Sequence, residues 1–207
     1  MKLKPRATRV TIIIVLPIMA VVGYYAFLSG RAKEHRAEAN MTAVESALSR
    51  NLDKDYPPTP KEVMKYYNDI MLCYYRDDVT NEEIDSLGIR ARELFDPDLQ
   101  AINETGSYLV RLHQDIDENR ENGRKITNAS VANSTNVDYY DRDGFHFARL
   151  MCTYNVTENN QSSTLRLIYL LRKDPTDNRW KIFGWDLYEN VDLTGEGAPS
   201  QQQSGDN

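Results

Sequence analysis

The longest apolar pattern in the chain lies near the N-terminus, at residues 10–28. These 19 residues read VTIIIVLPIMAVVGYYAFL and contain no charged side chain. A helix of this length spans about 28 Å at about 1.5 Å per residue, which matches the hydrocarbon layer of a bilayer. The alternative is a cleaved signal peptide, whose apolar region is shorter and ends in a small-residue cleavage site. The pattern therefore predicts a transmembrane helix at 10–28.

The charge that precedes this segment predicts its orientation. Four cations, and no acidic residue, come before the apolar run: Lys2, Lys4, Arg6 and Arg9. Short basic segments remain on the cytoplasmic side of a membrane. We therefore expect a single-pass protein of the cytoplasmic membrane, with a basic tail at 1–9 inside and the C-terminal domain outside.

Apolar residues spaced three and four positions apart predict helices further along the chain. They follow a charged, alanine-rich stretch at 29–57, which we interpret as a stalk, with a short juxtamembrane helix as the alternative. Thr59 and Glu62 form a capping box, which opens a helix that runs to about Tyr75. Two more helices are predicted at about 80–95 and 106–121.

Beyond Lys125 the pattern becomes extended. Strands are predicted near 125–132, 136–141, 145–157, 163–173 and 179–189. The Asp143-Gly144 pair is a strong hairpin signal, and the polar segment 191–207 has the composition of a disordered tail. Because helices and strands are segregated, the predicted fold class is α+β. An N-terminal transmembrane helix precedes a domain at 58–190, in which three helices pack on a curved, mainly antiparallel sheet.

Composition excludes one class of partner and gives no sign of a cofactor. The chain has 31 acidic and 25 basic residues, and its net charge is −6. An acidic domain without clustered cations repels nucleic-acid phosphates, so no nucleic-acid binding is expected. We find neither zinc-ligand spacing nor a calcium-loop motif, and predict no metal. Cys73 and Cys152 are predicted to be buried free thiols, with a disulfide as the alternative.

Three segments carry a resemblance to a known family: YPPTPKEVMKYYN, RARELFD and LLRKDPTDNRWKIFGW. They look like a family of uncharacterised membrane-anchored clostridial proteins. The helix-rich front half and the closing strand also resemble the cone-shaped fold of nuclear transport factor two-like (SnoaL-like) domains. The likeness spans roughly residues 50–190. It implies a bacterial host and a sheet wrapped around a cavity, but the fold alone does not choose a function.

Aromatic side chains are the candidate binding residues in such a cavity. Tyr66, Tyr67 and Tyr74 lie on the first predicted helix of the domain, and Tyr154 and Trp185 lie on predicted strands. A pocket lined by these rings would suit an apolar ligand with a few polar anchors. The alternative is that the same rings fill the core.

His146 is the catalytic candidate, and a weak one. Alternation along its strand places it on the same side as Ala148 and Leu150, which we take to be the inward side. An imidazole suits proton transfer near neutral pH, but it needs a carboxylate to orient it. The nearby acids lie in or beside a predicted turn and cannot be placed against the ring: Asp138, Asp141 and Asp143.

These observations favour a membrane-anchored extracytoplasmic binding or assembly module with a protein partner at the cell envelope. The alternative is a small-molecule enzyme or carrier that uses the cavity. An open cavity with His146 and a carboxylate at its wall would favour the enzyme. A cavity filled by tyrosine, tryptophan and leucine side chains would argue against it.

Overall fold

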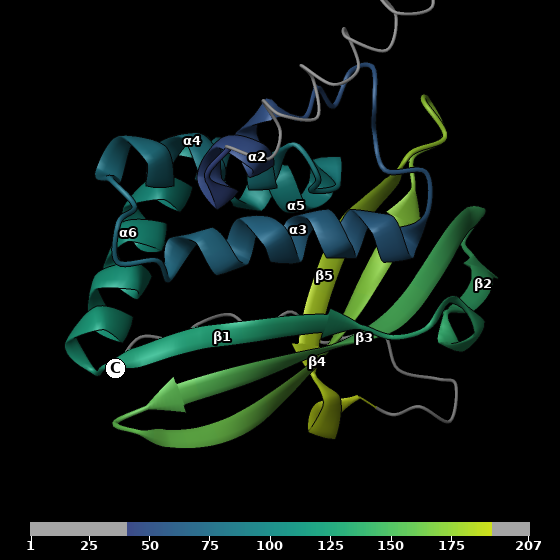
Figure 1. The fold of residues 1–207 in the computed structure, drawn as a ribbon. Helices are drawn as coiled ribbons and strands as arrows, with labels where there is room; N and C mark the ends of the chain where they lie inside the picture. The colour runs from purple at the N-terminus through teal and green to yellow at the C-terminus, as the bar shows by residue number, and fades with distance from the viewer. Residues whose placement is uncertain (1–40, 192–207) are drawn as a thin grey trace, which may run out of the picture. The chain divides into compact units, whose positions relative to one another are not determined.

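The computed structural model of the chain describes residues 41–191, and its elements belong to the compact unit that begins at Ala43. Within this range five α-helices precede five strands (Figure 1). The helices are α2 (Ala43–Ser49), α3 (Pro60–Tyr74), α4 (Asn81–Arg92), α5 (Pro97–Ile102) and α6 (Thr105–Glu121). The strands are β1 (Arg124–Val131), β2 (Asp138–Arg142), β3 (Phe145–Glu158), β4 (Gln161–Lys173) and β5 (Trp180–Leu187). Two 3-10 helices are η1 (Ser134–Asn136) and η2 (Tyr188–Asn190).

The predicted α+β class and antiparallel sheet are confirmed. The three predicted helices correspond to α3, α4 and α6, and the five predicted strands correspond to β1–β5 within a few residues. The additional helices α2 and α5 are seven and six residues long. Helices this short contain too few turns to produce a clear apolar period. α2 lies in the stretch 29–57, where a short helix was the alternative to a stalk.

The membrane architecture requires correction. Among residues 41–191, no helix is both long and apolar enough to cross a bilayer. The longest helix there, α6, has 17 residues, carries many charged side chains, and has Ile116 as its one buried residue. The segments predicted as a basic tail (1–9), a transmembrane helix (10–28) and most of a disordered tail (191–207) lie outside the described residues. The single-pass topology and the membrane as a partner are not retained.

α3 begins after the predicted capping residue Thr59, and α4 begins after a capping threonine of the same kind, Thr80. Thr59 accepts a hydrogen bond from the backbone N–H of Glu62 at 3.3 Å, at the start of α3. At the start of α4 the Thr80 side chain accepts from the Glu83 N–H, and the Glu83 carboxylate accepts from the Thr80 N–H. This reciprocal capping box uses two N–H groups that have no partner inside the helix.

The sheet has the strand order β1-β3-β4-β5, and β2 pairs with β3 beside β1. β1 and β2 therefore share one edge of β3. At the other edge, the chain that follows α4 joins β5, because the Ile182 N–H donates to the Leu94 carbonyl and the Asp96 N–H donates to the Ile182 carbonyl. Irregular pairing at Leu170/Leu171 and in β1 adds to the curvature.

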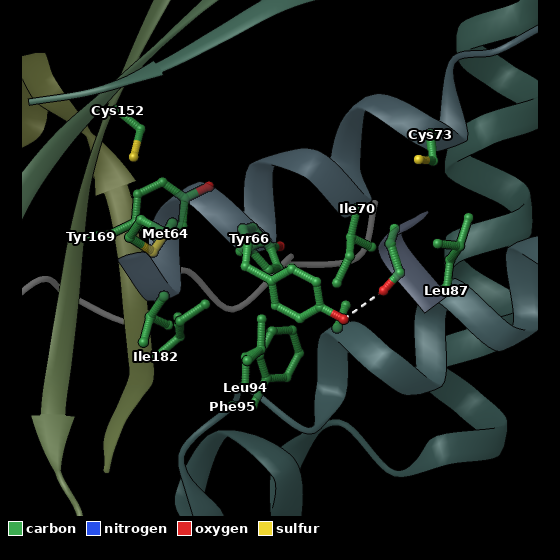
Figure 2. Packing of buried hydrophobic residues seen from close by; sticks show 14 of the residues in the cluster. Met64, Tyr66, Ile70, Cys73, Leu87, Leu94, Phe95, Cys152, Tyr169 and Ile182 are labelled. Atoms are coloured by element: carbon green, nitrogen blue, oxygen red, sulfur yellow. Dashed lines mark hydrogen bonds between the residues drawn. The ribbon is translucent and has the colours of Figure 1, made fainter. Parts of the chain in front are cut away.

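The core lies between the helices and one face of the sheet, with α3 running across that face (Figure 1). Ile70 on α3 is fully buried, as are Ala148, Leu171 and Ile182 on the sheet. Figure 2 shows Ile182 and Tyr169 on the sheet side of this packing, and Leu87 on the helical side. The face of β3–β5 that carries Ala148, Leu171 and Ile182 is called the inner face below.

The two cysteines are both free and buried, as predicted. Cys73 lies near the end of α3, where its thiol donates to the Asp69 carbonyl at 3.2 Å. Cys152 lies on β3 and accepts from the Asn68 amide at 3.9 Å. Figure 2 shows the two sulfur atoms at opposite ends of the core. The two thiols are therefore apart, because α3 is long enough to carry Cys73 away from β3.

Candidate functional site

The tyrosines of α3 have three different surroundings. The Tyr66 hydroxyl donates to the Ala47 carbonyl at 2.6 Å and joins α3 to α2, as the dashed line in Figure 2 marks. The Tyr67 ring lies 6.1 Å from that of Phe95 and 6.0 Å from that of Tyr169. Tyr74 is 2% exposed, and its buried hydroxyl makes no hydrogen bond of ordinary geometry in the described part of the chain. All three therefore belong to the packed interior.

A buried polar cluster links α3 to the sheet. The Tyr154 hydroxyl donates to Asn68 Oδ1 at 2.7 Å and lies 2.9 Å from the Tyr169 hydroxyl. Asn68 also donates to the Cys152 sulfur. Burial raises the pKa of the Cys152 thiol to about 12 and the pKa values of Tyr154 and Tyr169 well above their usual range. These groups stay protonated at neutral pH, so the cluster holds neither a thiolate nor a phenolate.

Trp185 lies at the rim of the packed region. Its ring centroid is 5.9 Å from that of Tyr169 and 6.2 Å from that of Phe95, yet the residue is 41% exposed. The ring therefore closes one side of the aromatic interior and presents its other side to solvent. Apart from Tyr66, the aromatic residues expected to line a cavity line neither of the two clefts described next.

The first cleft lies between α2 and α3 and has a volume of about 660 Å³. Its two arginines and its tyrosine already have partners within the protein. Arg50 binds Asp55 at 3.1 Å, and Arg76 binds Asp78 at 2.8 Å. The Tyr66 hydroxyl is held by α2, as described above. These contacts hold α2 and the end of α3 in place, which accounts for the two arginines and the tyrosine without a ligand.

The second cleft, here called the end groove, has a volume of about 440 Å³. It lies where the strands extend past the fully buried core. Its lining comes from four strands: Tyr139, Tyr140, Asp141, His146, Phe147, Lys173 and Trp180.

Strand register brings one row of these residues together across the inner face. Asp141 pairs with His146 between β2 and β3, and Lys173 pairs with Trp180 between β4 and β5. Phe147 pairs with Arg172, so the preceding residue, His146, comes beside Lys173. Alternation along each strand puts this row on the same side as Ala148, Leu171 and Ile182.

An aromatic pair forms one wall of the end groove. The rings of Tyr139 on β2 and Trp180 on β5 have centroids 5.7 Å apart. Three strand spacings separate β2 from β5, or about 14 Å in a flat sheet. The rings come together because the sheet curls at this end and because Ala148, opposite Tyr139, leaves room above β3. Tyr139 is 56% exposed, so much of its ring is open to solvent.

A histidine and a carboxylate form a second part of the wall. His146 Nδ1 contacts a carboxylate oxygen of Asp141, and the two side chains are 66% and 74% exposed. His146 lies on the inner face, as its strand pattern predicted, at the end where β3 extends beyond the helical layer, so its side chain is exposed. Engagement of Nδ1 by Asp141 leaves Nε2 as the ring nitrogen that can meet a ligand.

Lys173 provides the cation of the end groove. Its ammonium lies 5.8 Å from the centroid of the Trp180 ring. Across residues 41–191 it forms no ion pair with a carboxylate, in contrast to the arginines of the first cleft. No grouping of His, Cys, Asp and Glu side chains in this part of the chain could hold a metal ion.

Sequence reasoning missed Tyr139, Lys173 and Trp180 as site residues. The turn between β4 and β5 contains Asp174 and Asn178, and a hairpin there places Lys173 opposite Trp180. That signal was present in the sequence. The approach of Tyr139 to Trp180 had no local signal, because it depends on the curvature of the whole sheet.

Comparison with known proteins identifies the family but gives no activity. A family model described as "Domain of unknown function (DUF6715)" matches residues 1–185. The match covers most of the chain, so the protein belongs to this uncharacterised family, as the resemblance had indicated at the coarser level. No curated protein matches the chain.

Proposed function

We propose that this family member is a binding module and that the end groove is its ligand-binding surface. The observation that carries the proposal is the convergence, from four strands, of charged groups and aromatic rings, of which Tyr139 is more than half exposed. Ligand sites commonly combine an aromatic wall with a few polar groups that fix the ligand's orientation. The end groove has both, through Tyr139 and Trp180 on one side and Lys173 and His146 beside them.

Packing alone does not account for the exposed part of the end groove. Tyr139 lies on a five-residue strand at the sheet edge and is more than half exposed. The interior tyrosines, in contrast, are nearly inaccessible and contact other core residues. A large ring held at the surface beside a second ring is a ready contact for a ligand.

The alternative of an enzyme or carrier that uses the interior has less support. The interior positions expected to line a cavity hold packed tyrosines, and the buried thiol and phenols stay protonated. The Asp141–His146 pair lies outside that interior, at the surface. The proposal therefore concerns binding at the end groove.

The proposal also keeps two expectations from the resemblance: a clostridial host and a nuclear transport factor two-like arrangement of the sheet. The second is supported by helices that cover one face of a curved antiparallel sheet with a long central hairpin, β3–β4. This likeness in architecture names no ligand.

The proposal can be tested with small aromatic probes and the full-length chain. Phenol, benzyl alcohol, benzoate and benzylamine would be titrated, with saturation-transfer NMR reporting the dissociation constants. We expect at least one probe to bind, and Tyr139→Ala to weaken its affinity by about 2- to 12-fold, as loss of one aromatic contact implies.

The matched control is Tyr188→Ala, because Tyr188 is also exposed, at 37%, but lies on η2 outside the end groove. This variant should bind the probes as the original chain does. Circular dichroism would establish that both variants fold. Absence of binding by every probe, or equal affinity before and after the Tyr139 change, would overturn the proposal.

A further inference from the structure

The side chains around the end groove differ in whether they already have a partner within the protein. Asp141 and His146 are engaged with each other. Lys173 contacts the Trp180 ring and has no carboxylate partner within residues 41–191. An incoming ligand therefore meets one cation that is not committed to an ion pair, beside an aspartate and a histidine that already contact each other.

The position of Lys173 also favours contact between its ammonium and a ligand. It lies in the row between His146 and Trp180, and its side chain is only partly exposed. Its aliphatic stem can lie along the aromatic wall while the ammonium faces the groove. The exposed Tyr139 ring lies beside Trp180 in the same groove. A cation and an open aromatic surface are thus presented to one ligand at the same time.

We propose that the end groove binds organic anions in which a carboxylate is attached to a flat ring. The carboxylate would pair with the Lys173 ammonium, and the ring would pack on Tyr139. This inference rests on the proposed function and adds the chemical class of the ligand.

Two other ligand classes match the groove less well. A cationic ligand would face repulsion from Lys173, while the Asp141 carboxylate is already taken by His146. A neutral ring could pack on Tyr139 but would leave the ammonium without a counter-charge. The chain as a whole is acidic, with a net charge of −6, so an anion must be attracted locally, by a group such as Lys173.

The experiment compares benzoate with its neutral relative benzyl alcohol on the full-length chain, again by saturation-transfer NMR. We expect benzoate to bind about tenfold more tightly, which is the effect of one charge-assisted contact. Lys173→Met keeps an apolar stem and removes the charge. It should weaken benzoate about tenfold and change benzyl alcohol by less than about twofold.

Lys65→Met is the control, since Lys65 is exposed on α3 and does not line the end groove. It should leave both affinities unchanged. If benzyl alcohol binds as tightly as benzoate, or if Lys173→Met leaves benzoate binding unaltered, the inference is wrong while the proposed function stands. If neither probe responds to Tyr139→Ala, the proposed function itself fails.

Discussion

At the scale of a residue, the hydroxyls of two buried tyrosines differ in their hydrogen bonds, and we expect them to affect stability differently. Tyr154 and Tyr74 are both 2% exposed. The Tyr154 hydroxyl has Asn68 and Tyr169 as partners, whereas the Tyr74 hydroxyl makes no ordinary hydrogen bond in the described chain. Burial of Tyr74, together with the nearby Tyr108, raises its pKa and keeps it neutral. The same deletion at the two positions should therefore have opposite effects.

We predict that Tyr74→Phe raises the free energy of unfolding by about 1 kcal/mol, because it removes a buried polar atom whose desolvation is not compensated. Tyr154→Phe should lower it by about 1–3 kcal/mol, because Asn68 then loses its partner. Urea unfolding of both variants measures the difference. Equal destabilisation at the two positions would mean that the Tyr74 hydroxyl is in fact paired.

At the scale of elements, one contact between helices depends on a missing side chain. A Cβ atom on Gly88 of α4 would come within 2.7 Å of Leu109 and 2.8 Å of Leu112, both on α6. Such distances are too short for carbon atoms, so the leucine side chains would have to move. Gly106, on α6 itself, has open space around the corresponding position.

Gly88→Ala should therefore destabilise the protein by about 1–3 kcal/mol through overpacking, despite the better helix propensity of alanine. Gly106→Ala should be neutral or stabilising by up to about 1 kcal/mol, since only propensity changes there. The two unfolding free energies, measured side by side, separate packing from propensity. A stabilised Gly88→Ala variant would indicate that α4 and α6 are further apart than the structure places them.

Elements with strong local signals were predictable from the sequence. The capping pattern at Thr59 located the start of α3, and Asp143-Gly144 located the β2–β3 turn. Asp143 and Gly144 have φ angles of 52° and 80°, as a tight two-residue hairpin requires. That turn pairs Asp141 with His146, so the contact followed from the hairpin once its loop length was known.

Long-range features were less accessible from the sequence. The position of Trp185 at the rim depends on where the helices end above the sheet, and α5 is too short to produce a period. The convergence of Tyr139 and Trp180 depends on curvature accumulated over four strands. The local pattern gave the inner face of β3, on which His146 lies, but not how far the helical layer covers that face.

At the scale of the whole molecule, the shifted pKa values of buried groups make the free energy of unfolding depend on pH. The Cys152 thiol has an unperturbed pKa of 9.0, and burial raises it to about 12 in the folded protein. Between these values the unfolded chain has lost the thiol proton and the folded chain still holds it. The stabilisation is therefore fully present below about pH 9 and decreases as the pH rises toward 12.

We predict that the free energy of unfolding falls with pH above 9, and that Cys152→Ala reduces this dependence. One proton corresponds to a slope of at most about 1.4 kcal/mol per pH unit, and the variant should lose up to that amount. Urea unfolding at pH 7, 9 and 10 provides the comparison. The buried tyrosines, whose pKa is about 10 in the unfolded chain, also begin to titrate between pH 9 and 10, but they add the same slope to both proteins, so the difference between the two slopes reports Cys152. Identical slopes for the two proteins would show that Cys152 keeps its ordinary acidity, and hence that water reaches the buried polar cluster of Asn68, Tyr154 and Tyr169.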